Sequence, residues 1–392
     1  MDVATKMLSS LSCFYIILLC QIGMTAVWSC VTFTFFSFVD SYGTGFVLCY
    51  IGVILLPIKK IKIFHMQYEL TIIDVEDADA IVINYHDGNR WWTAVVDAGN
   101  VGDADKVKAN VRHKENNIYI IDYAFCTHPD KDHKGGFFDL LTDSQVEICN
   151  FCIRRPDILM RNDIRRLQYN VGELERAAKA VYNHPTDSTR NLIDEAIRYS
   201  HLVEPTLGID VVGMPLMVIG PRSRFFQDAC FQMAINFAEL VDEVDAENYA
   251  EDELPTEEEA QSVMDEVKEE SPTNKSSLIL LFHPNGRNFL LAGDACSATL
   301  KDAVEDYPQN IPGSALKVPH HGSKHNLTTE VINMLKPSSA VISAKGSKKH
   351  PNRAVVHFLS KHCNVYSTSK SGTLTYQSAP VTHPAIALRN KQ

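Results

Sequence analysis

Histidine and aspartate side chains crowd one short segment of the chain, residues 126–136, with the sequence CTHPDKDHKGG. Four of them fall within six residues, after an apolar strand-like run and before a predicted helix: His128, Asp130, Asp132 and His133. A divalent cation needs several convergent nitrogen and oxygen donors, and a turn can aim alternate side chains inward. The segment therefore predicts a metal site, with Asp132 also expected to be essential for catalysis.

Two more aspartates end apolar strand-like runs. Residues 288–294 (NFLLAGD) place Asp294 just past the end of a strand, which makes it a candidate ligand that bridges two metal ions. Asp97 ends the run 93–97, and we expect it to orient a ligand rather than to bind metal itself.

Three histidines follow two further predicted strands. Residues 316–323 (LKVPHHGS) contain His320 and His321, of which one is expected to lie near the metals and the other to transfer protons, in an order that the sequence leaves open. His350 follows a predicted strand at 339–343 and a Gly-Ser-Lys-Lys loop. We predict His350 as a metal ligand.

Strand-type and helix-type patterns alternate along the chain, which predicts an α/β fold. The predicted strands lie at 68–75, 80–85, 93–97, 118–126, 146–153, 210–219, 277–283, 288–292, 315–318 and 339–343. The predicted helices lie at 103–111, 135–141, 158–181, 188–202, 298–306, 328–335 and 352–362.

The order of these motifs resembles the metallo-β-lactamase fold. His-x-Asp-x-Asp-His after a strand is followed by Gly-Asp, by His-His-Gly-Ser and by His-Pro. The similarity is strongest to the hydrolase domain of ComEC-type DNA-uptake proteins, in which an aspartate stands where ribonuclease Z and glyoxalase II have the second histidine of His-x-His-x-Asp-His. The resemblance covers about 68–376 and implies a four-layer αββα sandwich.

The resemblance also implies two divalent metal ions, Zn or Mn. His128 and Asp130 would bind one ion, Asp132 and His133 the other, and Asp294 would bridge them. His350 would take the place of the family's last histidine ligand. The usual histidine between the first cluster and Gly-Asp has no clear counterpart, because Thr273-Asn274-Lys-Ser-Ser277 stands there. One metal site is therefore expected to be short of a protein ligand.

A pair of divalent cations suits phosphodiester hydrolysis, because it stabilises both the attacking and the leaving oxygen. The 37 Lys and Arg against 48 Asp and Glu give a net charge of −11, which excludes a general attraction to nucleic acid. A nucleic-acid substrate therefore needs a local basic patch, for which we expect Lys131, Lys134, Lys317, Lys324 and the arginine-bearing helices of 158–202.

Two other functions fit the same sequence. One is hydrolysis of a small ester, thioester or lactam in a closed apolar pocket. The other is a catalytically silent, membrane-tethered binding module. The ligand set argues against the second, because such side chains packed together without metal would repel one another.

The first 65 residues are strongly apolar. Residues 7–39 and 41–58 contain no charged residue, and lysines at 59, 60 and 62 follow them. We predict two helices, about 9–31 and 42–58, that form a membrane hairpin with both ends in the cytoplasm. A cleaved signal peptide fits less well, since the apolar stretch is too long. Alternatively, 1–65 is not native, and a cytoplasmic hydrolase domain of residues 66–392 begins at Met66.

An acidic segment, 239–270, interrupts the hydrolase domain. It holds fifteen Asp and Glu against one Lys. Such a segment repels itself, so we predict a solvated helix or loop and consider a protein partner there. The ten cysteines show no framework spacing, which favours free thiols.

Overall fold

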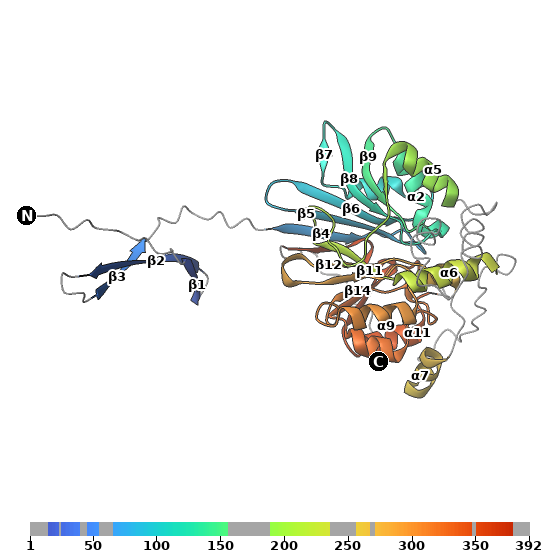
Figure 1. The fold of residues 1–392 in the computed structure, drawn as a ribbon. Coiled ribbons are helices and arrows are strands. Elements are labelled where there is room, and N and C mark those ends of the chain that lie inside the picture. The colour runs from blue at the N-terminus through green and yellow to red at the C-terminus, as the bar shows by residue number, and fades with distance from the viewer. Residues whose placement is uncertain are drawn as a thin grey trace, which may run out of the picture. The chain divides into compact units, whose positions relative to one another are not determined.

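The computed structural model describes most of the chain in detail. The described residues are 15–22, 25–39, 45–54, 66–155, 189–235, 256–266, 271–346 and 350–378. The chain divides into two compact units, Met1–Ile63 and Phe64–Gln392 (Figure 1). All of the predicted site residues belong to the second unit.

The described part of the first unit is an antiparallel sheet in the order β1-β2-β3, formed by β1 (Tyr15–Ile22), β2 (Thr25–Val39) and β3 (Gly45–Ile54). The prediction of two helices is therefore wrong for these residues. The sequence is rich in Val, Ile, Thr and aromatic residues, which favour strands over helices. Across the described residues, no helix combines the length and apolarity needed to span a bilayer.

The second unit contains two larger sheets. The first has the order β10-β9-β8-β6-β5-β4-β17, with β7 paired to β8. Its strands are β4 (Gln67–Ile72), β5 (Ala80–His86), β6 (Trp91–Ala98), β7 (Lys114–Glu115), β8 (Ile118–Phe125), β9 (Val146–Cys152), β10 (His201–Val203) and β17 (Leu374–Gln377). Strands β6, β8, β9 and β10 run parallel to one another.

The second sheet has the order β11-β12-β13-β14-β15-β16. Its strands are β11 (Leu216–Gly220), β12 (Ile279–Phe282), β13 (Phe289–Leu291), β14 (Ala315–Lys317), β15 (Ser339–Ile342) and β16 (Asn364–Ser367). The last four strands are parallel. The carboxyl ends of β13, β14 and β15, and those of β6 and β8, carry the predicted site residues.

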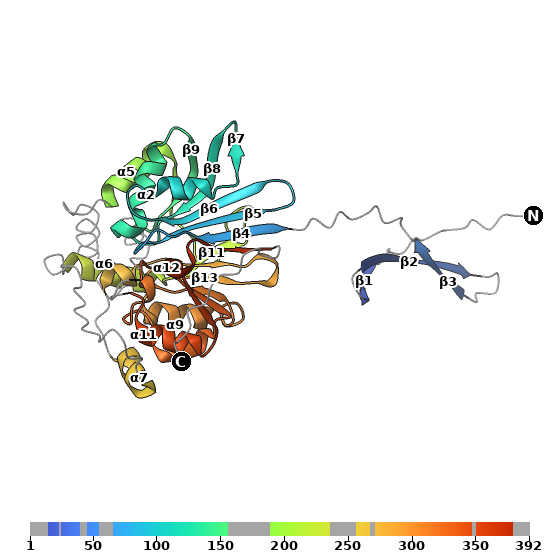
Figure 2. The same ribbon diagram turned by 180° about the vertical axis from the view of Figure 1, so that it is seen from behind.

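Helices cover the outer faces of both sheets (Figure 2). Next to the first sheet lie α1 (Ala104–Ala109), α2 (Lys131–Thr142) and α5 (Thr189–Tyr199). Next to the second lie α9 (Ser297–Asp306), α10 (Thr329–Leu335) and α11 (Arg353–Ser360). Further helices are α6 (Ser223–Ile235), α7 (Glu257–Asp265), α8 (Pro272–Lys275) and α12 (Thr368–Ser371).

Three apolar clusters correspond to the three interfaces of a four-layer arrangement. One lies between the first sheet and its helices, one between the two sheets, and one between the second sheet and its helices. In the central cluster, the buried ring of Phe282 makes an edge contact with Tyr68 and stacks on Phe289, with ring centroids 5.9 Å apart in both pairs. The predicted αββα sandwich is confirmed.

Part of the acidic segment 239–270 is helix α7, which packs against α11. Ala260 and Met264 are buried in the outer cluster of the second sheet. Glu257 forms an ion pair with Lys361, the residue that follows α11. The prediction of a helix is confirmed here, but full solvation is wrong for this part, because two apolar residues one helical turn apart give α7 a face that docks. The remaining residues of the segment lie outside the described ranges, as does the predicted helix at 158–181.

Candidate metal centre

The predicted metal-binding segment begins where β8 ends and continues into the first turn of α2. Two glycines let this turn approach the end of β6 closely. A Cβ on Gly136 would lie 2.1 Å from the carbonyl oxygen of Ala98, and one on Gly135 would lie 2.4 Å from the backbone nitrogen of Val101. The Gly136 N–H also donates to the Gly99 carbonyl at 3.1 Å. The Gly-Gly pair therefore fixes the metal-binding turn against the neighbouring strand.

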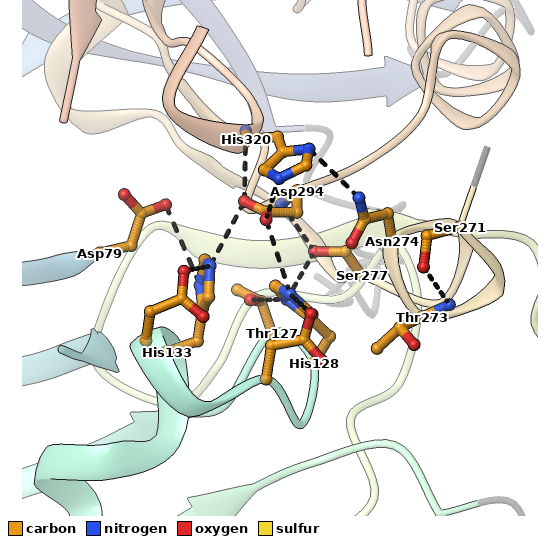
Figure 3. A network of polar contacts seen from close by, with 12 residues as sticks. Asp79, Thr127, His128, His133, Ser271, Thr273, Asn274, Ser277, Asp294 and His320 are labelled. Atoms are coloured by element: carbon orange, nitrogen blue, oxygen red, sulfur yellow. Dashed lines mark hydrogen bonds and ion pairs between the residues drawn. The ribbon is translucent and has the colours of Figure 1, made fainter. Parts of the chain in front are cut away.

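One candidate group of ligands consists of His128, His133 and Asp294, all buried (Figure 3). The two oxygens of Asp294 face different histidines: Oδ1 lies 3.3 Å from His133 Nε2, and Oδ2 lies 3.7 Å from His128 Nε2. This is the arrangement expected of a carboxylate between two cations. Asp130 adds Oδ2 at 3.5 Å from His128 Nε2, from the exposed side.

A second candidate group consists of Asp132, His133 and His321. Asp132 Oδ2 lies 3.1 Å from His321 Nε2 and 3.6 Å from His133 Nε2. His133 belongs to both groups, so the two groups are adjacent. Asp132 and His321, which are 189 positions apart in the sequence, therefore meet at one edge of the sandwich.

The ring nitrogens of His128 and His133 suit a cation. In both residues Nε2 is buried and has no hydrogen-bond partner among the described residues. His133 Nδ1 donates to Asp97 Oδ2 at 2.8 Å. The Thr127 hydroxyl donates to Asp97, so its oxygen is free to accept from His128 Nδ1 at 3.0 Å. In its neutral form each ring therefore carries its proton on Nδ1 and directs the Nε2 lone pair at the site, as metal-binding histidines do.

Asp97, which we expect to orient a ligand, lies within hydrogen-bond distance of Thr127 and His133. Its carboxylate accepts hydrogen bonds from the Thr127 backbone N–H at 2.8 Å, from the Thr127 hydroxyl at 2.7 Å and from His133. One buried carboxylate thus fixes the orientation of two candidate ligands, His133 directly and His128 through Thr127.

The structure distinguishes the two adjacent histidines. His321 is buried, and its Nδ1 donates to the Ser343 carbonyl at 2.8 Å, which leaves Nε2 directed at Asp132. His320 is partly exposed, and its Nδ1 donates to Asn326 Oδ1 at 2.8 Å. The geometry therefore favours His321 as the ligand and His320 as the residue that meets solvent and substrate.

His350 lies beside this pair, with ring centroids 5.6 Å from His320 and 6.0 Å from His321. It belongs to neither candidate group of ligands. Its proximity to the centre agrees with the sequence analysis, whereas its role as a ligand stays a prediction.

Several supporting residues were not singled out from the sequence. Asn274 Nδ2 lies 3.2 Å from His320 Nδ1, and the Ser277 hydroxyl accepts from the Asp294 backbone N–H at 3.0 Å. Both come from the segment that stands in place of the missing histidine. Asp79, buried between β4 and β5, lies 4.0 Å from His133 Nδ1. Its sequence context, an acidic turn between two strands, gave no signal of a site.

Similarity to known proteins is found both in sequence and in structure. No family model matches the chain. The chain is 34% identical over 115 residues to ComE operon protein 3 of Bacillus subtilis, a match that covers 29% of this chain and 15% of that protein. Among solved structures, the metallo-beta-lactamase fold protein YhfI of B. subtilis is similar over 80% of this chain and 100% of its own, with 8% identity and a TM-score of 0.41. Zn²⁺-bound PqqB of Methylobacterium extorquens is similar over 76% of this chain and 86% of its own, with 11% identity and a TM-score of 0.36.

The second unit is an αββα sandwich. Its motifs at the carboxyl ends of β6, β8, β13 and β14 stand in the order for which the sequence resembles the metallo-β-lactamase fold. The chain spans about 15% of the length of ComE operon protein 3. The fold and the candidate ligands support divalent-metal binding.

The lysines predicted to contact substrate differ in exposure. Lys131 is exposed and Lys324 is partly buried, so both can face a substrate. Lys134 is only 3% exposed, and Lys317 is fully buried in an ion pair with Asp79. The expectation that Lys134 and Lys317 contribute to an exposed basic track is therefore wrong. Lys134 lies on the first turn of α2, and its side chain is buried.

The candidate ligands shift one another's pKa values. Burial by itself lowers the pKa of His133, but the carboxylates of Asp294, Asp132 and Asp97 outweigh it and raise that pKa well above its ordinary value. Burial raises the pKa of Asp294, but His133 and His320 outweigh it and hold the pKa of Asp294 well below its ordinary value. In the metal-free protein, His133 therefore keeps a proton where a cation would otherwise bind.

We expect metal affinity to rise with pH, because the cation competes with the His133 proton. An ordinary histidine has a pKa of about 6.5, and the raised value extends this competition above that pH. Because the pKa of His133 is raised in the folded protein, its protonation stabilises the metal-free fold below about pH 6.5. This stabilisation is lost as pH rises through the raised pKa of His133. Calorimetric titration with Mn²⁺ in two buffers of different ionisation enthalpy measures proton release. An affinity that stays constant from about pH 6 to 8 contradicts this prediction.

Proposed function

We propose that this chain is a metal-dependent hydrolase that cleaves phosphodiester bonds, with DNA or another nucleic acid as substrate. One observation carries the proposal. The buried Nε2 atoms of His128 and His133, which have no hydrogen-bond partner among the described residues, face opposite oxygens of Asp294 at 3.7 and 3.3 Å. This is a donor set for two adjacent cations, which suits the displacement of one oxygen by another at phosphorus.

Divalent cations held there would supply Lewis acidity and a bound water of lowered pKa. The chain's own residues would fix the geometry. Asp97 holds His133 in its binding orientation, and Ser277 holds the backbone of Asp294. Asp132, on the first turn of α2, and His321, in the loop after β14, would bind the second cation.

His320 is the group best placed to deliver a proton to the leaving oxygen. Its Nδ1 is fixed by Asn326, so the ring cannot turn freely. Its Nε2 lies 3.9 Å from Asp294 Oδ2, at the partly exposed side of the centre. A leaving oxygen held beside Asp294 would lie within reach of that nitrogen.

The choice of a phosphodiester rests on charge and on resemblance. Lys131 is exposed next to the metal-binding turn and would meet a phosphate. The ordered motifs resemble those of ComEC-type DNA-uptake proteins. Burial of Lys134 and Lys317 shortens the expected basic track, so a small-ester hydrolase remains the alternative that the substrate test must address.

A substrate panel tests the proposal on the full chain. We expect Mn²⁺- or Zn²⁺-dependent cleavage of linear DNA or RNA, inhibited by EDTA, with no turnover of nitrocefin or a thioester. Asp132→Ala should reduce cleavage by at least about 100-fold, through loss of a ligand. Asp306→Asn, which removes an Arg222 contact on α9, should keep full activity. Turnover of a thioester or lactam alone would refute the phosphodiester substrate.

A further inference from the structure

A buried ion pair joins the two sheets directly behind the candidate metal centre. Asp79 lies between β4 and β5 of the first sheet, and Lys317 is the last residue of β14 in the second. Their side chains are 1% and 0% exposed, and Lys317 Nζ donates to Asp79 Oδ2. A lysine so buried is rare unless it is paired, so this pair is a specific feature of the site.

Asp79 is attached to the two segments of the first sheet that reach the site, the one after β8 with the candidate ligands and the one after β6 with the orienting residue Asp97. Its backbone N–H donates to the Asp132 carbonyl at 3.1 Å, and its own carbonyl accepts from the Gly99 N–H at 2.8 Å. Its carboxylate faces two candidate ligands: Oδ1 lies 3.8 Å from His321 Nδ1 and Oδ2 lies 4.0 Å from His133 Nδ1. Figure 3 shows the Asp79 carboxylate directed at the His133 ring.

Lys317 is the partner of Asp79 on the second sheet. It precedes His320 by three residues, and the next strand, β15, runs parallel to its own. After β15, Ser343 accepts from His321 Nδ1 at 2.8 Å through its carbonyl, while its hydroxyl donates to the Ala78 carbonyl at 2.6 Å, next to Asp79. The histidine-bearing loop of the second sheet is therefore held to the Asp79 turn at two points.

The charges of the pair matter as well as its geometry. Asp79 Oδ1 has no hydrogen-bond partner among the described residues, so its negative charge is directed into the site. Such a charge behind an imidazole strengthens that ring as a metal ligand. Lys317 pairs with the other oxygen of the carboxylate, as buried charges in proteins usually require.

We propose that Asp79 and Lys317 are positioning residues that set the spacing between the two halves of the metal centre. First-sheet ligands (His128, Asp132, His133) and second-sheet ligands (Asp294, His321) must meet within a few tenths of an ångström for one cation to bind both. The inference rests on the metal site of the proposed function, but not on its substrate.

Two variants test this in the full chain. Asp79→Asn removes one charge with little change in shape. The double variant D79N/K317M replaces the whole ion pair with neutral side chains, which folded proteins often tolerate. For each we would measure thermal unfolding without metal, Zn²⁺ and Mn²⁺ affinity by chelator competition, and the absorption spectrum of the Co²⁺-loaded protein, which reports ligand geometry. Both variants should bind metal about 10- to 100-fold more weakly and show a changed Co²⁺ spectrum.

Glu204→Gln is the matched control, because it weakens an interior contact with Arg154 that involves none of the candidate ligands. It should change thermal stability without changing metal affinity or the Co²⁺ spectrum. If the double variant folds and binds metal with wild-type affinity and spectrum, the pair has no positioning role. If the variants bind metal more weakly as expected but the wild-type protein cleaves no phosphodiester, the proposed substrate is refuted and this inference stands. A wild-type protein that binds no metal would overturn both.

Discussion

Replacing Asp294 with asparagine is expected to lower metal-dependent phosphodiesterase activity by about 10³-fold. Each oxygen of Asp294 faces a different histidine, so its charge serves both candidate cation positions. Loss of metal-based charge stabilisation costs several kcal/mol in the transition state, and each 1.4 kcal/mol is about tenfold in rate. Asparagine keeps the shape of the side chain but loses the charge. Initial rates with saturating Mn²⁺ and linear DNA measure the effect.

The matched control is Asp302→Asn, which removes a carboxylate from the outer helix α9, where it accepts from Arg222 at 2.7 Å. It should leave the rate unchanged. If the initial rate of Asp294→Asn is within about threefold of the wild-type rate, the loss is far smaller than the 10³-fold expected from lost metal ligation. Asp294 then does not hold the metals.

Phe282→Ala is expected to lower the free energy of unfolding by about 3–5 kcal/mol. The ring is fully buried between the two sheets, where it contacts Tyr68, Tyr85 and Phe289. Its removal would leave a cavity in the layer that holds the sandwich together. Urea unfolding of the full chain, followed by tryptophan fluorescence, measures the change.

Val101→Ala is a suitable control, because that side chain is 73% exposed and should change stability by less than about 0.5 kcal/mol. A loss below about 1 kcal/mol for Phe282→Ala would mean that the two sheets do not pack through this ring.

Most strands of the two large sheets could be predicted from the sequence, because buried parallel strands appear as short apolar, β-branched runs bounded by turn residues. Elements without that signal were missed. β16 and β17 are short and partly polar, and β10 follows α5 after one residue, so the helical pattern hid it. Only the last part of the strand predicted at 210–219 forms, as β11.

The first unit shows that hydropathy alone does not distinguish a helix from strands. A long apolar run is compatible with a helix or with strands, and length alone favoured helices at 9–31 and 42–58. The β-branched and aromatic content of the same residues indicated strands, and the structure has strands.

More of the site than of its surroundings could be predicted from the sequence. The ordering of His128, Asp132, His133, Asp294 and His321 along the chain identified residues that the structure brings together. Burial could not be inferred from residue type, so Lys134 was placed at the surface. Pairing between distant residues could not be inferred from the sequence either. Asp79 and Lys317 are 238 positions apart, and the residues around them give no sign of an ion pair.

Metal stoichiometry tests the central claim most directly, because His133 belongs to both candidate groups of ligands. The full chain, loaded with Zn²⁺ or Mn²⁺ and dialysed, would be analysed for bound metal by mass spectrometry beside His133→Ala. We predict two ions per wild-type chain and loss of both in the variant. Wild-type protein that retains no divalent metal, or retains the same amount as His133→Ala, would contradict a metal centre at this edge of the sandwich.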